Sequence, residues 1–334
     1  MSVIPPVQPA PPTVESDEEV EQLALPGQPV LLRKQRLRVD GRLAILRKFV
    51  RPDGPKVVLV HGFAQNRYTW HSPGRSLSAW LAGQGFDVHV LELRGHGNSR
   101  AAGGPERFAD YVADAKAAAR ALREPAFWVG HSLGGAASYA VATETPVRGI
   151  IGLGALYRFG RANLALNVLC RLSNLVRGRE FLGGVSVRTR LAGQLLGRLY
   201  GISDIAGYAF PISGWAPGSI EPELLAERLE RGFDWTSLHV WLDMARWGAA
   251  QDFDYAAGWK RTDVPLLVIA GDMDHLMPPD DARAAYDESG STDRRWVLMD
   301  DWNTGHHWGH LDLILGREAP RVVWTVLADW MRER

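Results

Sequence analysis

One stretch, residues 127–136, limits what this chain can fold into more than any other. It reads FWVGHSLGGA: an apolar run stops at a serine, glycines take over, and a proline-free run of small and apolar residues follows. A buried strand that turns sharply into a helix fits this order, because Gly130 and Gly134 leave room for a strained backbone at Ser132. A glycine-rich turn capped by a serine fits the bare pattern as well. The flanking strand and helix favour a nucleophile elbow.

Other short motifs follow apolar runs elsewhere in the chain. They are HGF at 61–63, RGHGNS at 94–99, GDMD at 271–274 and GHLD at 309–312. Together with the elbow, they resemble the α/β-hydrolase family in content and in order, from about residue 38 to the end. The insertion described below lies outside this resemblance.

The resemblance implies a Ser-His-Asp triad and an oxyanion hole. Ser132 would be the nucleophile, Asp274 the acid and His310 the base, because the family places them in that chain order. The backbone N–H groups of Phe63, after the first buried strand, and of Leu133, after the nucleophile, would stabilise the oxyanion. Such a site needs no cofactor and no metal.

Some acids and histidines near these motifs offer alternatives. Asp272 is the second choice for the acid. His96 lies upstream of the nucleophile, so we interpret it as structural. His306, His307 and His310 together suggest a metal site, but no cysteine lies nearby and the triad already accounts for His310.

Alternating strand and helix signals predict an α/β fold with a mostly parallel, doubly wound sheet. We assign residues 31–155 and 261–334 to this α/β-hydrolase core. One helix is expected at 107–123, where Phe108, Tyr111, Val112 and Ala115 are spaced for a single buried face. Further helices are expected at 76–82 and 320–331.

A long insertion, residues 156–260, separates the strands predicted at 147–155 and 265–270 and is far longer than an ordinary crossover. We expect a helical cap over the active site. Its apolar stripes are Ala165, Leu169, Leu172 and Val176; Val187, Leu191, Leu195 and Leu199; and Leu238, Trp241, Leu242 and Ala245. Most of these are core positions, but five tryptophans would also line an apolar pocket. These are Trp215, Trp235, Trp241, Trp247 and Trp259.

The N-terminal residues 1–30 are expected to be disordered. They contain seven prolines, and five acidic residues lie between positions 15 and 21. Such a segment buries too little apolar surface to offset the entropy of ordering it. Residues 31–50, which flank an Asp40-Gly41 turn signal, predict an exposed edge hairpin whose basic residues discourage pairing with other chains.

Composition excludes some classes of partner. The formal net charge is zero, and the basic hairpin has no interleaved aromatic residues, so nucleic acid is not an expected partner. One cysteine, Cys170, allows no internal disulfide, and residues 1–30 lack a signal-peptide pattern, which favours a cytoplasmic location. Residues 156–200 carry eight arginines against one acidic residue. Pairing with the acidic half of the insertion is the simpler explanation, and contact with anionic lipid is the alternative.

The expected function is hydrolysis of carboxylic esters with an apolar acyl group, through an acyl-enzyme. Serine at the elbow argues against the dehalogenase and epoxide-hydrolase members, which use aspartate there. Fold and triad do not fix the substrate, so thioester, C–C bond and peracid chemistry stay open. A non-hydrolysing small-molecule receptor of the same fold is the alternative from another class. The oligomeric state is not predicted.

Overall fold

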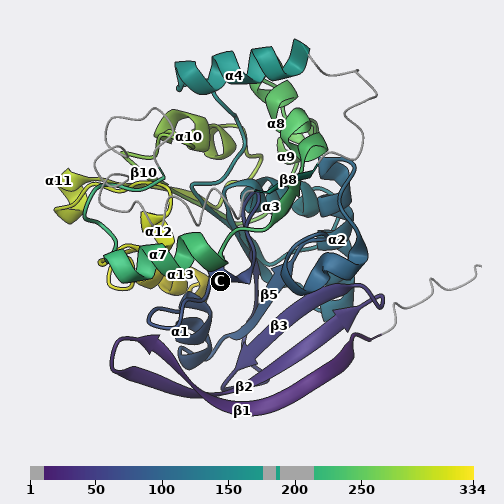
Figure 1. Cartoon of the computed structure of the whole chain (residues 1–334), viewed down its shortest axis with the longest axis vertical. Helices are drawn as coiled ribbons and strands as arrows, with labels where there is room; N and C mark the ends of the chain where they lie inside the picture. The colour runs from purple at the N-terminus through teal and green to yellow at the C-terminus, as the bar shows by residue number, and fades with distance from the viewer. Residues whose placement is uncertain (1–10, 176–185, 189–213) are drawn as a thin grey trace, which may run out of the picture.

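A nine-stranded sheet crosses the molecule in the order β1-β2-β3-β5-β4-β6-β7-β10-β11 (Figure 1). The computed structural model describes residues 11–175, 186–188 and 214–334. The strands of the sheet are β1 (Thr13–Leu25), β2 (Gln28–Val39), β3 (Leu43–Phe49), β4 (Lys56–Val60), β5 (Asp87–Glu92), β6 (Phe127–His131), β7 (Gly149–Leu153), β10 (Leu266–Gly271) and β11 (Arg294–Met299).

The sheet is parallel from β5 to β11, and only β1, β2 and β3 run antiparallel to their neighbours. The prediction of a mostly parallel α/β sheet is therefore confirmed. Because parallel strands share a direction, the carboxyl ends of β4, β6, β7, β10 and β11 meet at one edge of the sheet. In open α/β sheets, ligands bind along this edge.

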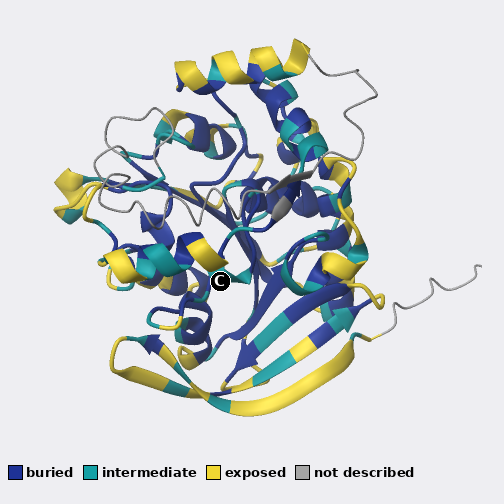
Figure 2. Cartoon of the chain, in the orientation of Figure 1, coloured by how far each residue is buried: buried dark blue, intermediate teal, exposed yellow. Residues whose placement is uncertain are grey.

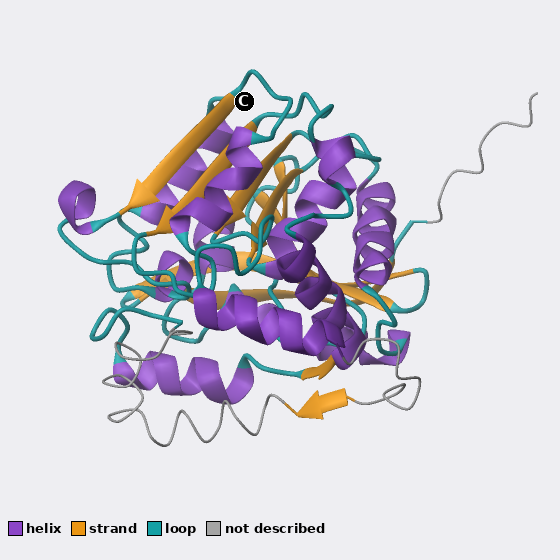
Figure 3. Ribbon diagram, turned by 90° about the horizontal axis from the view of Figure 1, so that it is seen from above, coloured by secondary structure: helices purple, strands orange, loops and turns teal. Residues whose placement is uncertain are grey.

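Helices cover both faces of the sheet (Figure 3). One face packs against α1 (Leu77–Gly83) and α13 (Val323–Arg332). The other packs against α2 (Phe108–Leu122), α3 (Leu133–Ala142) and α10 (Pro279–Asp287). These segments confirm the helices expected near 76–82, 107–123 and 320–331, including the buried face of α2.

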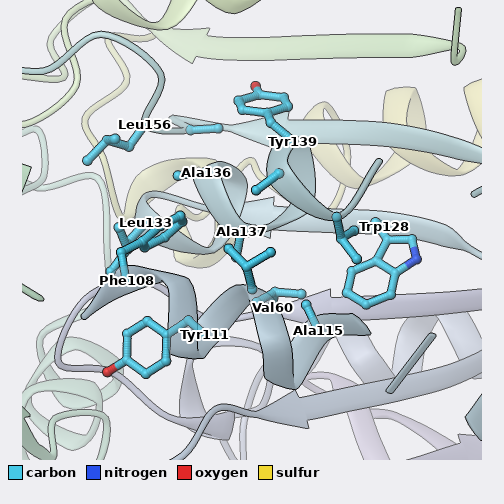
Figure 4. Close-up of a cluster of buried hydrophobic side chains, with 14 of the residues drawn as sticks. Val60, Phe108, Tyr111, Ala115, Trp128, Leu133, Ala136, Ala137, Tyr139 and Leu156 are labelled. Carbon is cyan, nitrogen blue, oxygen red and sulfur yellow. The ribbon is translucent and has the colours of Figure 1, made fainter. Parts of the chain in front are cut away.

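The helix after the elbow is buried along its whole length. Ala136 and Ala137 of α3 belong to one buried cluster with Val60 of the sheet and the α2 side chains Tyr111 and Ala115 (Figure 4). Small residues on α3 let it sit close to the sheet, and close packing of this kind is costly to disturb. The elbow therefore stands on a rigid support.

Between β7 and β10 lie α4 (Leu164–Leu175), α7 (Pro222–Arg231), α8 (Leu238–Ala250), α9 (Ala256–Trp259) and a short ribbon of β8 (Ser186–Arg188) with β9 (Trp235–Ser237). The stripe predicted on α8 faces inward, with Leu242 and Ala245 buried. The stripe expected at 187–199 is wrong at its first residue, because Val187 lies in strand β8. The rest of that stripe lies outside the described residues.

The stripe predicted on α4 is wrong. Leu166 and Cys170 are its buried residues, whereas Ala165, Leu169 and Leu172 are exposed (Figure 2). Helix α4 is apolar on most sides, so periodicity alone does not identify the packed face. The contact with α8 decides it, because Gly248 leaves room for the Cys170 side chain to approach within 2.7 Å of where a β-carbon would lie.

The prediction of a disordered N-terminus is wrong for Thr13–Leu25, which forms β1 and pairs antiparallel with β2 along its length. The predicted edge hairpin is therefore not the edge, because β1 covers β2 (Figure 1). Ala24 is buried, and the Gln22 amide donates hydrogen bonds to Ser76 and contacts His71. These contacts tie the end of β1 to the segment that starts α1.

Complementary charge explains why an acidic segment is ordered here. Across the two strands, Asp17 pairs with Arg33 at 2.6 Å, Glu18 with Lys34 at 2.7 Å and Glu15 with Arg38 at 2.8 Å. Exposed ion pairs of this kind contribute little to stability, so the backbone ladder carries most of it. The pairs remove the repulsion that would otherwise act within the acidic segment.

Lys48 of β3 is buried and has no carboxylate partner among the residues that the structure describes; its ammonium group donates to Ser78 at 2.9 Å. Burial, followed by the charges of Lys34 and Arg67, lowers the pKa of Lys48 to about 7. The unfolded chain holds this proton up to a pH near 10.5, so stability should rise with pH between about 7 and 10. We expect Lys48→Met to raise the free energy of unfolding at pH 7 by about 1–3 kcal/mol and to flatten that slope.

Urea denaturation at pH 7, 8, 9 and 10 measures this effect. Lys116→Met is the matched control, because Lys116 of α2 is partly exposed, pairs with Glu144 and is not among the charges that lower the pKa of Lys48. An unchanged slope in Lys48→Met, or a loss of stability at pH 7, would contradict the prediction.

Candidate active site

Ser132 lies at the tip of the turn between β6 and α3, with φ 56° and ψ −125°. Few non-glycine residues adopt such angles, and this strain is typical of a nucleophile elbow. The glycines beside it are required. A β-carbon at Gly134 would lie 2.2 Å from the Val60 carbonyl oxygen, and one at Gly130 would lie 2.4 Å from the Gly134 carbonyl oxygen.

Asp274 and His310 form a buried pair at the same edge of the sheet. Asp274 follows β10 and His310 follows β11, and the distance from Asp274 Oδ2 to His310 Nδ1 is 2.7 Å. Both side chains are nearly inaccessible. The other carboxylate oxygen, Oδ1, accepts the backbone N–H groups of Leu276 and Met277 at 3.0 and 2.7 Å. The carboxylate is therefore held in place while it orients the imidazole.

Residues next to Ser132 connect it to this pair. The Ser132 N–H donates to the Leu153 carbonyl at 3.2 Å, and Gly154 follows directly. A β-carbon on Gly154 would lie 2.9 Å from Asp274 Oδ2 and 3.1 Å from His310 Nδ1. Only glycine leaves room for the Asp274–His310 contact at the end of β7.

The residue before the nucleophile also contacts the histidine. The ring of His131 lies 4.3 Å from the ring of His310, and His131 Nε2 lies 3.1 Å from the His310 carbonyl oxygen. Burial, and then the charge on His310, lowers the pKa of His131. A neutral ring can pack against His310 without repelling it when it takes up a proton.

The two N–H groups expected in the oxyanion hole belong to Phe63 and Leu133, in segments that adjoin Ser132. The backbone at Gly62 approaches the serine so closely that a β-carbon there would be 2.9 Å from the Ser132 β-carbon. Phe63 follows Gly62, and Leu133 begins α3. Within the described part of the chain, neither the Phe63 N–H nor the Leu133 N–H donates to another residue. Both are therefore available to an oxyanion.

The second-choice acid has a different partner. Asp272 Oδ2 lies 2.6 Å from His307 Nδ1, and Asp272 Oδ1 accepts the Trp308 N–H at 2.8 Å. The His307 side chain is about half exposed, and its hydrogen bond to Asp272 raises its pKa. His306 is exposed as well. Among the described residues, no three His, Cys, Asp or Glu side chains are grouped so as to hold a metal ion.

His96 belongs to the RGHGNS loop, and its side chain contacts Tyr111 and His61. Its Nε2 lies 2.8 Å from the Tyr111 hydroxyl, and its ring lies 5.0 Å from that of His61. Burial lowers the pKa of His96 to about 3, so it stays neutral near pH 7. This environment agrees with a structural role.

Two close neighbours of the site were not singled out from the sequence, His131 and Gly154. A sequence signal exists for Gly154, since a glycine directly after an apolar strand marks a close approach or a positive φ, and its φ is 47°. No comparable signal exists for His131. Its contact with His310 depends on how β6 and β11 are placed in the sheet.

A family model described as the alpha/beta hydrolase family matches residues 57–323. The chain belongs to the alpha/beta hydrolase family. The matched range includes every residue named above for the triad and the oxyanion hole. It also includes the whole insertion between β7 and β10.

Individual proteins of the family are similar over different lengths. A pimeloyl-[acyl-carrier protein] methyl ester esterase of Stenotrophomonas maltophilia is 41% identical over 109 residues, which cover 32% of this chain and 39% of that esterase. A monoacylglycerol lipase of Paleococcus ferrophilus shares the fold with a TM-score of 0.63 at 18% identity, covering 87% of this chain and 99% of the lipase. An esterase of Exiguobacterium antarcticum has a TM-score of 0.61 at 16% identity, covering 89% and 98%.

Proposed function

We propose that the protein is a serine hydrolase that cleaves carboxylic esters of an apolar acyl group through an acyl-enzyme. The observation that carries this proposal is the buried Asp274–His310 pair, 2.7 Å apart, beside a serine held at φ 56°. Membership of the alpha/beta hydrolase family and similarity to esterases and lipases support a hydrolase.

In the proposed mechanism, Ser132 Oγ attacks the acyl carbonyl carbon while His310 Nε2 accepts its proton. The contact with Asp274 favours the tautomer with hydrogen on Nδ1, which leaves Nε2 as the acceptor. The Phe63 and Leu133 N–H groups stabilise the tetrahedral oxyanion. His310 returns the proton to the departing alcohol. Water then attacks the acyl-enzyme by the same route and releases the acid.

Other acyl chemistry would use the same residues, so substrate panels must decide. Purified protein should hydrolyse model esters at a rate that depends on enzyme concentration. Faster turnover of thioesters would favour a thioesterase. Absence of turnover on every ester and thioester, with tight binding of a small molecule, would favour the receptor alternative.

The apolar acyl group is proposed from the side chains around Phe63. The Trp241 ring on α8 lies 6.4 Å from the Phe63 ring and 6.1 Å from the Phe159 ring. Trp241 is only partly buried, and its indole N–H donates to Ser173 on α4 at 3.0 Å. Trp247 and Trp259 instead belong to the core. We assign Trp241 to an acyl site because its ring lies near the ring of Phe63.

Chain length should control kcat/KM if this site accepts an acyl chain. Each buried methylene contributes about 0.8 kcal/mol, roughly fourfold in kcat/KM where the gain appears in the transition state. We expect kcat/KM to rise from p-nitrophenyl acetate to medium or long chains, measured below the micelle concentration of each ester. A maximum at acetate or butyrate with a steady decline beyond would contradict the apolar acyl group.

A variant pair sharpens the same measurement. Trp241→Ala should flatten the rise, whereas Trp302→Ala, at a 94% exposed position on α11 (Asp301–Thr304), should leave it unchanged. If kcat/KM still rises with chain length to the same extent in Trp241→Ala, the acyl chain does not bind at Trp241.

Contact with an anionic lipid surface stays a prediction, and α4 is the element that supports it. Its exposed apolar side chains are Leu164, Val168, Leu169, Leu172 and Leu175 (Figure 2). Residues 156–175 contain three arginines and no acidic residue. Within the described ranges, no helix is long and apolar enough to cross a bilayer. A cytoplasmic location also stays a prediction.

Co-sedimentation with vesicles tests the contact. We expect binding to vesicles that contain phosphatidylglycerol, weaker binding to phosphatidylcholine alone, and a loss of about fivefold or more in Leu172→Ser/Leu175→Ser. Equal binding of the variant and the wild-type protein would contradict a lipid contact through α4.

A further inference from the structure

A short segment of the insertion, residues 214–219, lies against the loop that carries His310. We call it the approach segment, because it leads into α7. The Leu311 N–H donates to the Gly214 carbonyl at 2.7 Å, and the Arg317 N–H donates to the Ser219 carbonyl at 2.9 Å. A β-carbon at Gly309 would lie 2.6 Å from the Trp215 α-carbon, so the two backbones are in direct contact.

The Asp312 side chain accepts hydrogen bonds both from the approach segment and from the loop that carries His310, which we call the base loop. From the approach segment, the Ala216 N–H donates to its Oδ2 at 2.8 Å and the Ser219 hydroxyl donates to its Oδ1 at 2.6 Å. From the base loop, the Gly309 N–H donates to Oδ2. Gly309 is the residue directly before His310. One carboxyl group thus fixes the backbone beside the proposed base.

The Asp312 carboxyl group is buried and depends on these hydrogen bonds. Its side chain is 1% exposed, and its hydrogen bonds are all to neutral donors. Burial, with a contribution from Asp274, raises the pKa of Asp312 to about 7. Water does not reach this buried site to replace a lost hydrogen bond. Removing the carboxyl group would therefore leave the Ala216 and Gly309 N–H groups unpaired.

We propose that Asp312 is a positioning residue, which holds His310 in its working orientation by fixing the base loop to the approach segment. This inference rests on the proposed function, because it assigns His310 as the base. It also gives residues 214–219 a part in the active site, although they lie in the insertion.

Asp281 on α10 provides a matched control. It is also fully buried, with a raised pKa caused first by burial, and it accepts backbone N–H groups of the insertion, from Arg161 at 3.0 Å and Ala162 at 3.2 Å. None of its hydrogen bonds in the described chain goes to the base loop. Asp281→Ala should therefore loosen the insertion at its other end without moving His310.

Steady-state kinetics with a p-nitrophenyl ester test the proposal on full-length variants. We expect Asp312→Ala to lower kcat by about thirtyfold or more with KM within threefold of wild type, because small displacements of a catalytic group cost one to two orders of magnitude. Asp281→Ala should keep kcat within threefold of wild type, even if its melting temperature falls as far as that of Asp312→Ala.

The conservative variant separates hydrogen bonding from charge. In Asp312→Asn, the amide oxygen can accept the Ala216 and Gly309 N–H groups, and the amide NH₂ can donate to the Ser219 oxygen. Recovery of kcat to within about threefold of wild type would support positioning through hydrogen bonds. Equal losses of kcat in Asp312→Ala and Asp281→Ala, or full activity of Asp312→Ala, would overturn the proposal.

If Asp312→Ala does not fold, Ser219→Ala decides the question, because it removes a single bond to Asp312. A three- to tenfold lower kcat at unchanged KM is then expected, and unchanged kcat would overturn the proposal. Failure of the proposed function is a separate result. In that case His310→Ala itself would keep its activity, whatever the Asp312 variants do.

Discussion

Ser132→Ala should abolish ester hydrolysis, with kcat at least about a thousandfold below wild type, and leave the fold intact. Alanine fits the same tight turn and removes only the attacking oxygen. Turnover of a p-nitrophenyl ester and the thermal unfolding midpoint of each variant are the measurements.

Ser138→Ala is the control for this variant. Ser138 lies on the same buried helix, and its hydroxyl donates to the Gly134 carbonyl at 2.9 Å, so its loss perturbs α3 without touching the nucleophile. Ser138→Ala should keep most of its activity. Undiminished turnover in Ser132→Ala would remove this serine from the mechanism.

The second large effect is expected at the base and the acid. His310→Ala should be as inactive as Ser132→Ala, and Asp274→Asn should lose roughly a hundredfold to ten-thousandfold in kcat, because the imidazole loses the partner that sets its tautomer. His307→Ala and Asp272→Asn should each lose less than about tenfold, since they pair with one another at the surface.

The measurement is kcat and KM for the four variants on one ester, with circular dichroism to check folding. A reversal of the order, with His307 or Asp272 indispensable, would show that the acid and the base are misassigned.

Much of the fold could be predicted from local signals. The strand, turn and helix around Ser132 occupy consecutive residues, so glycine spacing and apolar runs suffice to predict them. The same holds for β10 and β11 and for the motifs that follow them. Asp274 and His310 could be named because the GDMD and GHLD motifs resemble the acid and base loops of the α/β-hydrolase family and occur in the family's order.

Strand β1 was missed although its partner β2 begins directly after the Pro26-Gly27 turn, because the composition of the acidic segment outweighed that turn signal. Judged alone, residues 15–21 are an acidic run with little to bury. Arg33, Lys34 and Arg38 compensate that charge from β2, and composition cannot show that the two runs pair. The zero net charge of the chain conceals this pairing.

The face of α4 and the role of Asp312 depend on tertiary contacts. Helix α4 carries apolar residues on most sides, so Gly248 on α8 decides which of them is buried. Asp312 belongs to a recognisable motif, but its bonds to Ala216 and Ser219 join segments that are about ninety residues apart in the chain. No local pattern predicts them.

Active-site labelling tests the central claim most directly. Wild-type protein is treated with a fluorophosphonate, and the adduct is located by peptide mass spectrometry. The account predicts one phosphonyl group per chain on the peptide that carries Ser132, and no labelling of Ser132→Ala. An adduct on another residue, or labelling that persists in Ser132→Ala, would contradict it.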